Sequence, residues 1–101
     1  MPVIIDTDNN TVVAHLQGEI DHHIAPELRK DIDLAIDRYR PEILVLDFDE
    51  VTFMDSSGIG LVMGRYKAVK AFGGRVEVKN TSSQLKKVMK LAGLDRLASI
   101  K

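Results

Sequence analysis

Ile43-Leu44-Val45-Leu46-Asp47-Phe48 decides the fold, because it contains the most strand-like run in this chain of 101 residues. A continuous run of branched apolar side chains is typical of a strand covered on both faces, and hence of a central strand in an α/β sheet. Pro41 lies just before the run and ends the helical pattern that precedes it. We expect the strand to end near Phe48 and a helix to begin near Ser56 or Ser57.

The flanking segments predict the remaining elements. Residues 3–7 and 11–16 surround a polar turn and indicate a hairpin, and residues 75–79 alternate as a further strand. Three segments have helical periodicity. The residues expected to face inward are Leu28, Ile32, Ala35, Ile36 and Tyr39 in the first helix, Ile59, Val62, Met63, Tyr66 and Val69 in the second, and Leu85, Val88, Met89 and Ala92 in the third. The apolar tail from Leu94 to Ile100 is expected to pack back onto the domain. The predicted order is β-β-α-β-α-β-α, an α/β fold with a mixed sheet of about four strands covered by helices.

Composition limits the class of protein. The length and a hydrophobic content of 45% predict one domain spanning residues 1–101. A net charge of −1 argues against direct DNA binding, and the absence of cysteine excludes disulfides and thiolate metal sites. The N-terminus has no signal-peptide pattern, and the longest apolar runs are too short to span a membrane. We expect a soluble, cytoplasmic protein that makes no membrane contact and carries neither a metal nor a cofactor.

The segment Asp55-Ser56-Ser57-Gly58 places two hydroxyls at the start of the second helix. Asp55 or Ser56 can serve as the N-cap, which leaves Ser57 exposed in the first turn, where helix N–H groups stabilise a phosphate by about 0.3–1 kcal/mol. Glycines follow at positions 58, 60 and 64, and each costs a helix interior roughly 1 kcal/mol relative to alanine. Close approach by another backbone, from the sheet or from a partner, explains them. The alternative is that the serines only cap the helix and the glycines only allow tight internal packing.

Other chemistries fit the sequence less well. A serine hydrolase needs a nucleophile elbow, but the residues two before Ser57 and Ser56 are Asp55 and Met54 rather than glycine. Asp47-Phe48-Asp49-Glu50-Val51 resembles the signature of haloacid-dehalogenase-type phosphatases, and a small magnesium-dependent phosphatase or nucleotide hydrolase using Asp47 is the alternative function. Too little chain follows to supply the rest of such a site, and a solvated acidic strand end is the simpler interpretation. Arg65 and Lys67 are expected to be exposed on the second helix.

The run from Leu44 to Phe48, followed by Val51-Thr52-Phe53-Met54-Asp55-Ser56-Ser57-Gly58-Ile59-Gly60, closely resembles the signature of anti-sigma-factor antagonists, the stand-alone STAS domains of bacteria. Gly18-Glu19-Ile20-Asp21, Ala25-Pro26-Glu27-Leu28 and Leu91-Ala92-Gly93-Leu94 are similar to other parts of that family. The similarity covers nearly the whole chain and is strongest to the sporulation antagonists that control sigma factor F.

The resemblance implies a non-catalytic switch. Ser57 corresponds to the serine phosphorylated by the anti-sigma factor, a serine kinase with bound adenine nucleotide. The unphosphorylated antagonist binds this kinase and frees the sigma factor, and a serine phosphatase resets the phosphorylated form. We expect the partner-binding residues to be Asp21, Asp55, Ser56, Gly58, Ile59, Gly60 and Arg65.

Residues near Ser57 in the sequence suggest how the phosphate acts. Four carboxylates lie close in sequence, whereas the first basic residue downstream is Arg65. We therefore expect the phosphate to spoil a partner surface by charge and bulk without remodelling the domain. Ser56 is assigned to capping, and the bare backbone at Gly58 and Gly60 is expected to let a kinase bring ATP to the Ser57 hydroxyl.

Overall fold

The computed structural model describes residues 3–101. Its elements in chain order are β1 (Val3–Asp8), β2 (Thr11–Ile20), α1 (Ala25–Tyr39), β3 (Ile43–Met54), α2 (Ser56–Lys70), β4 (Arg75–Lys79), α3 (Ser83–Leu91), a short 3-10 helix (Leu94–Arg96) and β5 (Ser99–Ile100). The strands form one sheet in the order β1-β2-β3-β4-β5. β1 and β2 pair antiparallel, and the other neighbours pair parallel. The predicted mixed α/β fold is confirmed.

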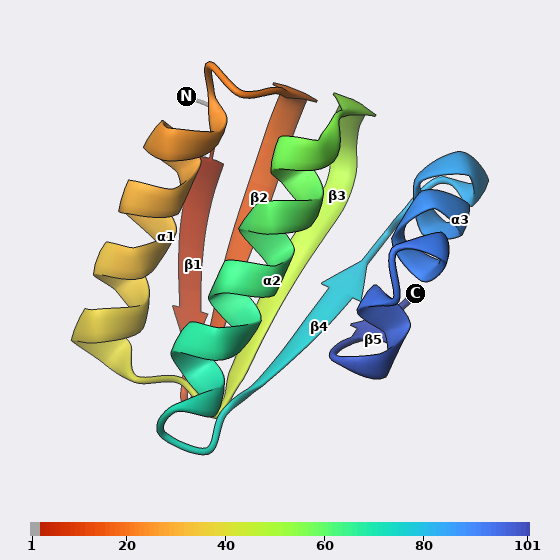
Figure 1. The fold of residues 1–101 in the computed structure, drawn as a ribbon. Helices are drawn as coiled ribbons and strands as arrows, with labels where there is room; N and C mark the ends of the chain where they lie inside the picture. The colour runs from red at the N-terminus through yellow and green to blue at the C-terminus, as the bar shows by residue number, and fades with distance from the viewer. Residues whose placement is uncertain (1–2) are drawn as a thin grey trace.

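Two parallel connections place α1 and α2 side by side on one face of the sheet (Figure 1). β2 leads into α1 and β3 leads into α2, so both helices begin at the same edge of the sheet. The core lies between these helices and the alternate side chains of β2 and β3. It includes Val12, Ala14, Leu16, Leu28, Ile32, Ile36, Leu44, Leu46, Phe48, Leu61, Val62 and Val69. Each large apolar side chain buried there contributes about 1.5–3 kcal/mol of transfer free energy.

The sheet has a fifth strand that the sequence pattern did not predict. Ser99 and Ile100 pair parallel with Glu77 and Val78 of β4. Two residues carry too little alternation to be distinguished from an apolar tail. The tail does pack back onto the domain, because Leu94, Ala98 and Ile100 belong to the core.

β3 is longer than expected, since it continues past Phe48 to Met54 and remains paired with β2 throughout. Charged Asp49 and Glu50 suggested a loop, but both side chains are exposed, while Val51 and Met54 are buried. Two register shifts between β2 and β3, one on either side of Gln17–Gly18 in β2, each place one extra residue in β3 and accommodate this extension. Gly18 has a φ of 77°, which favours glycine.

The inward face of α2 also differs from the predicted one. The buried residues are Gly58, Leu61, Val62, Arg65 and Val69. Of the residues expected to point inward, Val62 and Val69 are buried, Ile59 and Tyr66 are only partly buried, and Met63 is exposed. Apolar side chains occur around much of this helix, so periodicity alone did not identify the buried face. In α1 the predicted face is right except for Tyr39, which is exposed at the end of the helix.

Candidate functional site

A single residue, Asp55, separates β3 from α2. Its backbone N–H donates to the carbonyl of Ile20, 3.1 Å away at the end of β2. Its side-chain Oδ1 accepts a hydrogen bond of 2.7 Å from the Ser57 N–H, which makes Asp55 the N-cap of α2. The beginning of α2 is therefore fixed directly to the two central strands.

The serines occupy different environments in the first turn of α2. Ser56 is the first helical residue, is exposed and makes no capping hydrogen bond, so its predicted role as the cap is wrong. Ser57 is half-buried rather than fully exposed. Its hydroxyl makes no hydrogen bond within residues 3–101 and lies at a groove between α1 and α2. A free hydroxyl at this place is available to accept a phosphoryl group.

The β2–α1 connection lies next to this helix start. Asp21 Oδ1 accepts hydrogen bonds from the backbone N–H groups of His23 at 2.9 Å and Ile24 at 3.1 Å. The bond from Ile24 is the main reason why the pKa of Asp21 lies below its ordinary value. His22 and His23 are exposed with their rings 4.1 Å apart, and His22 Nδ1 is 3.9 Å from Asp55 Oδ2. Both histidines lie at the exposed entrance to α1.

The groove between α1 and α2 has a volume of about 380 Å³. Ser57, Gly60 and Gly64 line it from α2, and Arg29 lines it from α1. His22 and Arg65 complete its basic lining, and no acidic side chain is part of it among the described residues. The carboxylates close to Ser57 in sequence therefore do not describe its surroundings in space, because basic residues distant in sequence share its groove.

The glycines of α2 have different roles. Gly58 is buried, and a Cβ there would overlap the side chain of Met54 and lie 3.5 Å from Ile20. Its bare backbone serves internal packing, and the prediction that it also admits a kinase stays a prediction. Gly60 and Gly64 have no atom within 4 Å of an added Cβ and line the groove, which remains open partly because both lack side chains.

Arg65 is buried, with 6% of its surface exposed, and its predicted exposure is wrong. Its Nε lies 2.8 Å from Asp33 Oδ1 of α1. The contact is an ion pair rather than an aligned hydrogen bond, because Arg65 Nε and Nη1 both lack a hydrogen-bond partner within residues 3–101. Burial lowers the pKa of Arg65, Asp33 opposes this effect, and the like charge of Arg29 adds to the lowering.

The structure brings most of the predicted site residues to one end of the domain. Asp21, Asp55, Ser56 and Ser57 lie where β2 and β3 meet their helices, and Ile59 and Gly60 continue from there along α2. Gly58 and Arg65 lie beneath the surface. Sequence reasoning missed Arg29. The alternating order β2-α1-β3-α2 could have revealed it, since two helices that start at one sheet edge bring their first turns together.

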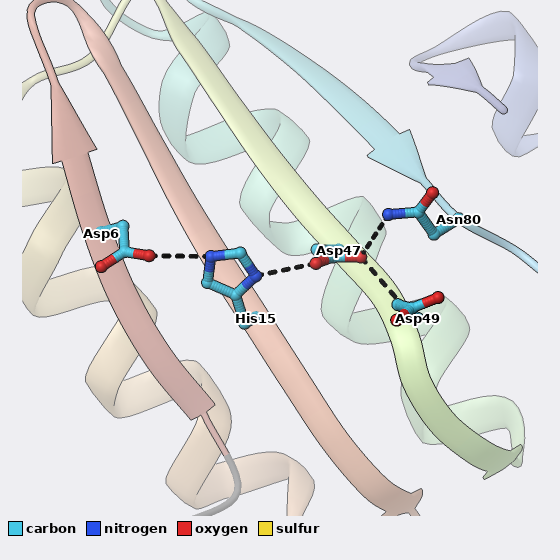
Figure 2. Close-up of polar contacts among 5 residues, drawn as sticks. All are labelled: Asp6, His15, Asp47, Asp49 and Asn80. Atoms are coloured by element: carbon cyan, nitrogen blue, oxygen red, sulfur yellow. Dashed lines mark hydrogen bonds and ion pairs between the residues drawn. The ribbon is translucent and has the colours of Figure 1, made fainter.

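A second polar cluster lies on the sheet face opposite α1 and α2 (Figure 2). His15 Nδ1 lies 2.7 Å from Asp47 Oδ2, and His15 Nε2 lies 2.9 Å from Asp6 Oδ2. Asp47 Oδ1 also accepts from Asn80 Nδ2 at 2.8 Å and from the Asp49 N–H at 3.0 Å. Both ring nitrogens of His15 face carboxylates, and only the protonated imidazole carries an N–H on each.

These contacts shift two pKa values. The hydrogen bond with Asp47 raises the pKa of His15, partial desolvation opposes it, and Asp6 adds to the increase. Burial acts to raise the pKa of Asp47, but hydrogen bonds from Asn80 and His15 outweigh it and the pKa is lowered. The Asp47 carboxylate is thus engaged in structural contacts with β2, β3 and the residue after β4, and His15 extends the cluster to Asp6 of β1. Within residues 3–101 no group of three or more His, Cys, Asp or Glu side chains is arranged to hold a metal ion, and both Asp47 oxygens are already engaged, so this geometry does not favour a phosphatase using Asp47.

Among the helices of residues 3–101, none has the length and apolar character needed to cross a membrane. The family model for the STAS domain matches residues 2–101. The anti-sigma F factor antagonist of Paenibacillus polymyxa is 31% identical over 100 residues, which cover 99% of this chain and 86% of the relative.

Two solved structures extend the comparison. The anti-sigma factor antagonist SpoIIAA in its unphosphorylated form is 34% identical with a TM-score of 0.84, covering 98% of this chain and 87% of that one. The phosphorylated form of the Bacillus cell fate determinant SpoIIAA is 34% identical with a TM-score of 0.77, covering 98% and 90%. The resemblance found in the sequence is confirmed, and the chain belongs to the STAS domain family.

Proposed function

We propose that this chain is an anti-anti-sigma factor controlled by phosphorylation of Ser57. Its unphosphorylated form binds an anti-sigma factor that is a serine kinase holding an adenine nucleotide, and this binding releases the sigma factor. Phosphorylation ends the binding, and a serine phosphatase restores the active form. In this proposal the chain is a cytoplasmic regulator and not an enzyme, and it needs no cofactor of its own.

The observation that carries the proposal is the position of Ser57. Its hydroxyl, which makes no hydrogen bond within residues 3–101, lies in the first turn of α2 beside an open groove, and the Asp55 cap fixes its backbone. The names of the relatives supply the regulatory class, and solved structures of SpoIIAA represent unphosphorylated and phosphorylated forms. Together these observations favour a switch that acts at the α2 start over chemistry at Asp47.

The proposed partner surface is the accessible part of the α2 start and its surroundings. Ser56 and Gly60 are exposed, Ile59 is partly buried, and Asp21 and Asp55 are half-buried beside them. In this proposal Gly58 and Arg65 shape that surface from below, Gly58 through its contact with Met54 and Arg65 through its charge.

Intact-mass spectrometry tests the modification directly. The wild type, Ser57→Ala and Ser56→Ala are incubated with the cognate anti-sigma factor and ATP. One added phosphate is expected on the wild type and on Ser56→Ala, and none on Ser57→Ala. Phosphate on Ser57→Ala, or none on the wild type, would refute the assignment.

A binding measurement tests the switch. Ser57→Ala is expected to bind the anti-sigma factor as tightly as the unphosphorylated wild type. Ser57→Asp is expected to bind at least about 30-fold more weakly, because a charge in a desolvated interface costs about 2–5 kcal/mol. Equal affinity of the two variants would show that charge at position 57 does not control binding.

A further inference from the structure

We infer that the groove between α1 and α2 receives the phosphoryl group of phosphorylated Ser57, with Arg29 as its main ligand, Arg65 adding positive charge and His22 lining the groove beside them. The inference rests on the proposed phosphorylation of Ser57 and deepens it. The phosphate is then held by the chain that carries it, in addition to facing a partner.

The lining of the groove has the charge that such a ligand requires. Ser57 shares it with His22, Arg29 and Arg65, and no carboxylate lines it within the described residues. This concentration of positive charge occurs in a chain whose net charge is −1. Guanidinium groups bind phosphate through paired, charge-assisted hydrogen bonds, which are stronger than hydrogen bonds between neutral groups.

The two arginines are incompletely neutralised. Arg65 has one carboxylate, Asp33, and its buried Nη1 has no hydrogen-bond partner within residues 3–101. Arg29 makes no ion pair among the described residues and is close enough for its charge to destabilise that of Arg65. An anion in the groove would relieve this repulsion, so the unmodified protein already has an electrostatic site for one.

The groove also has space for the group. Gly60 and Gly64 line it with open space where a Cβ would be, and its volume of about 380 Å³ is far larger than a phosphoryl group. The Arg29 side chain is exposed and free to reorient. The neighbouring carboxylate of Asp55 has one oxygen bonded to the Ser57 N–H and the other 3.9 Å from His22. These contacts moderate its repulsion of the phosphate.

Phosphate held in the groove would change the mechanism of the switch. A phosphoryl group projecting into solvent blocks a partner by repulsion alone. A phosphoryl group bound by Arg29 also occupies the groove and gives Arg29 a fixed orientation. The partner can then contact neither the Ser57 hydroxyl nor the groove beside it.

The test is a ³¹P NMR titration of protein carrying phosphoserine at position 57, installed during translation so that no kinase is needed. The second pKa of a free phosphoserine is about 6. A surface ion pair contributes up to about 1 kcal/mol, and one pKa unit corresponds to about 1.36 kcal/mol. Loss of the ion pair in Arg29→Gln is therefore expected to raise the phosphate pKa by about half a unit relative to the wild type.

Two further variants make the result specific. Lys30→Gln removes the same charge from the next residue of α1, which is exposed and lies outside the groove lining, and is expected to leave the phosphate pKa nearly unchanged. Arg29→Lys keeps the charge, so its phosphate pKa is expected to lie between that of the wild type and that of Arg29→Gln. No change in Arg29→Gln, or equal changes in Arg29→Gln and Lys30→Gln, would overturn the inference.

The outcome is separable from that of the proposed function. If the anti-sigma factor fails to phosphorylate the wild type but Arg29→Gln alone raises the phosphate pKa, the switch is refuted and the phosphate site stands. If phosphorylation at Ser57 occurs but the pKa does not depend on Arg29, the switch stands and the phosphate site is refuted.

Discussion

Gly58 and Gly60 provide a matched pair in which the same substitution is expected to have opposite effects. Both lie in α2, where alanine is favoured over glycine by up to about 1 kcal/mol. At Gly60 an added Cβ has no atom within 4 Å, so Gly60→Ala is expected to stabilise the protein by about 0.5–1 kcal/mol. At Gly58 the Cβ would overlap Cγ and Sδ of Met54.

The cost at Gly58 depends on whether Met54 can move. Its side chain is only 8% exposed, so it cannot rotate into solvent without opening the core. Overpacking of this kind costs about 1–3 kcal/mol, which exceeds the helix gain. We therefore expect Gly58→Ala to lower the free energy of unfolding by about 1–2 kcal/mol. The melting temperatures of the two variants should then differ by about 10 °C.

Urea unfolding followed by circular dichroism measures both free energies, since the chain has no tryptophan. The reasoning would be refuted if Gly58→Ala were as stable as Gly60→Ala. Phosphorylation provides a further check. We expect Gly58→Val to lose phosphorylation in proportion to its loss of folded protein, and a loss of phosphorylation in fully folded Gly58→Val would restore a direct role for Gly58 in kinase access.

Four further substitutions test other parts of the structure. Asp55→Ala is expected to lower the free energy of unfolding by about 1 kcal/mol through loss of the N-cap, whereas Ser56→Ala should change it by less than about 0.5 kcal/mol in the same urea assay. Asp33→Asn is expected to cost about 1–3 kcal/mol, because the buried Arg65 loses its only carboxylate within the described residues, and no loss would contradict the importance of this ion pair. Because the pKa of His15 is raised in the folded protein, protonated His15 stabilises the fold fully below its unfolded pKa of about 6.5. This stabilisation is lost as the pH rises through the folded pKa. The melting temperature of the wild type should therefore decline above about pH 6.5, and this decline should be shallower in His15→Gln. An equally steep decline in the variant would show that other groups cause it.

The lowered pKa of Asp47 determines how the stability of the fold changes at acid pH. The ionised Asp47 stabilises the fold above its unfolded pKa of about 3.9, and this stabilisation is lost as the pH falls through the lower folded pKa. The cluster in Figure 2 is therefore expected to stabilise the fold most between about pH 4 and 6.5. A melting temperature that rises steadily between pH 6.5 and 8.5 would contradict the proposed contribution of His15.

Local patterns predicted the parts of the fold that have strong local causes. The branched run 43–46 indicated a central strand, and the spacing of Leu28, Ile32 and Ile36 identified the buried face of α1. The end of β3 escaped prediction because its exposed charges have the same sequence signature as a loop. Only pairing with β2 distinguishes the two.

The sequence predicted residues of the candidate site but not which distant residues lie beside them in the folded protein. The Asp-Ser-Ser-Gly segment indicated the start of a helix, and the family resemblance implied phosphorylation of Ser57. It could not show that Arg29, 28 residues earlier in the numbering, shares the groove of Ser57. Nor could it show that Arg65 is buried, because its neutralisation by Asp33 depends on the packing of two helices.

The direct connection of β3 to α2 through Asp55 also determines how this region moves. A phosphorylated residue in a flexible loop must lose conformational entropy each time a partner binds. Here the Ser57 N–H is bonded to the cap, and the cap is bonded to the neighbouring strand. The amide proton of Ser57 should therefore exchange with solvent much more slowly than that of an ordinary loop residue. A partner can then bind this surface in the conformation that it already has.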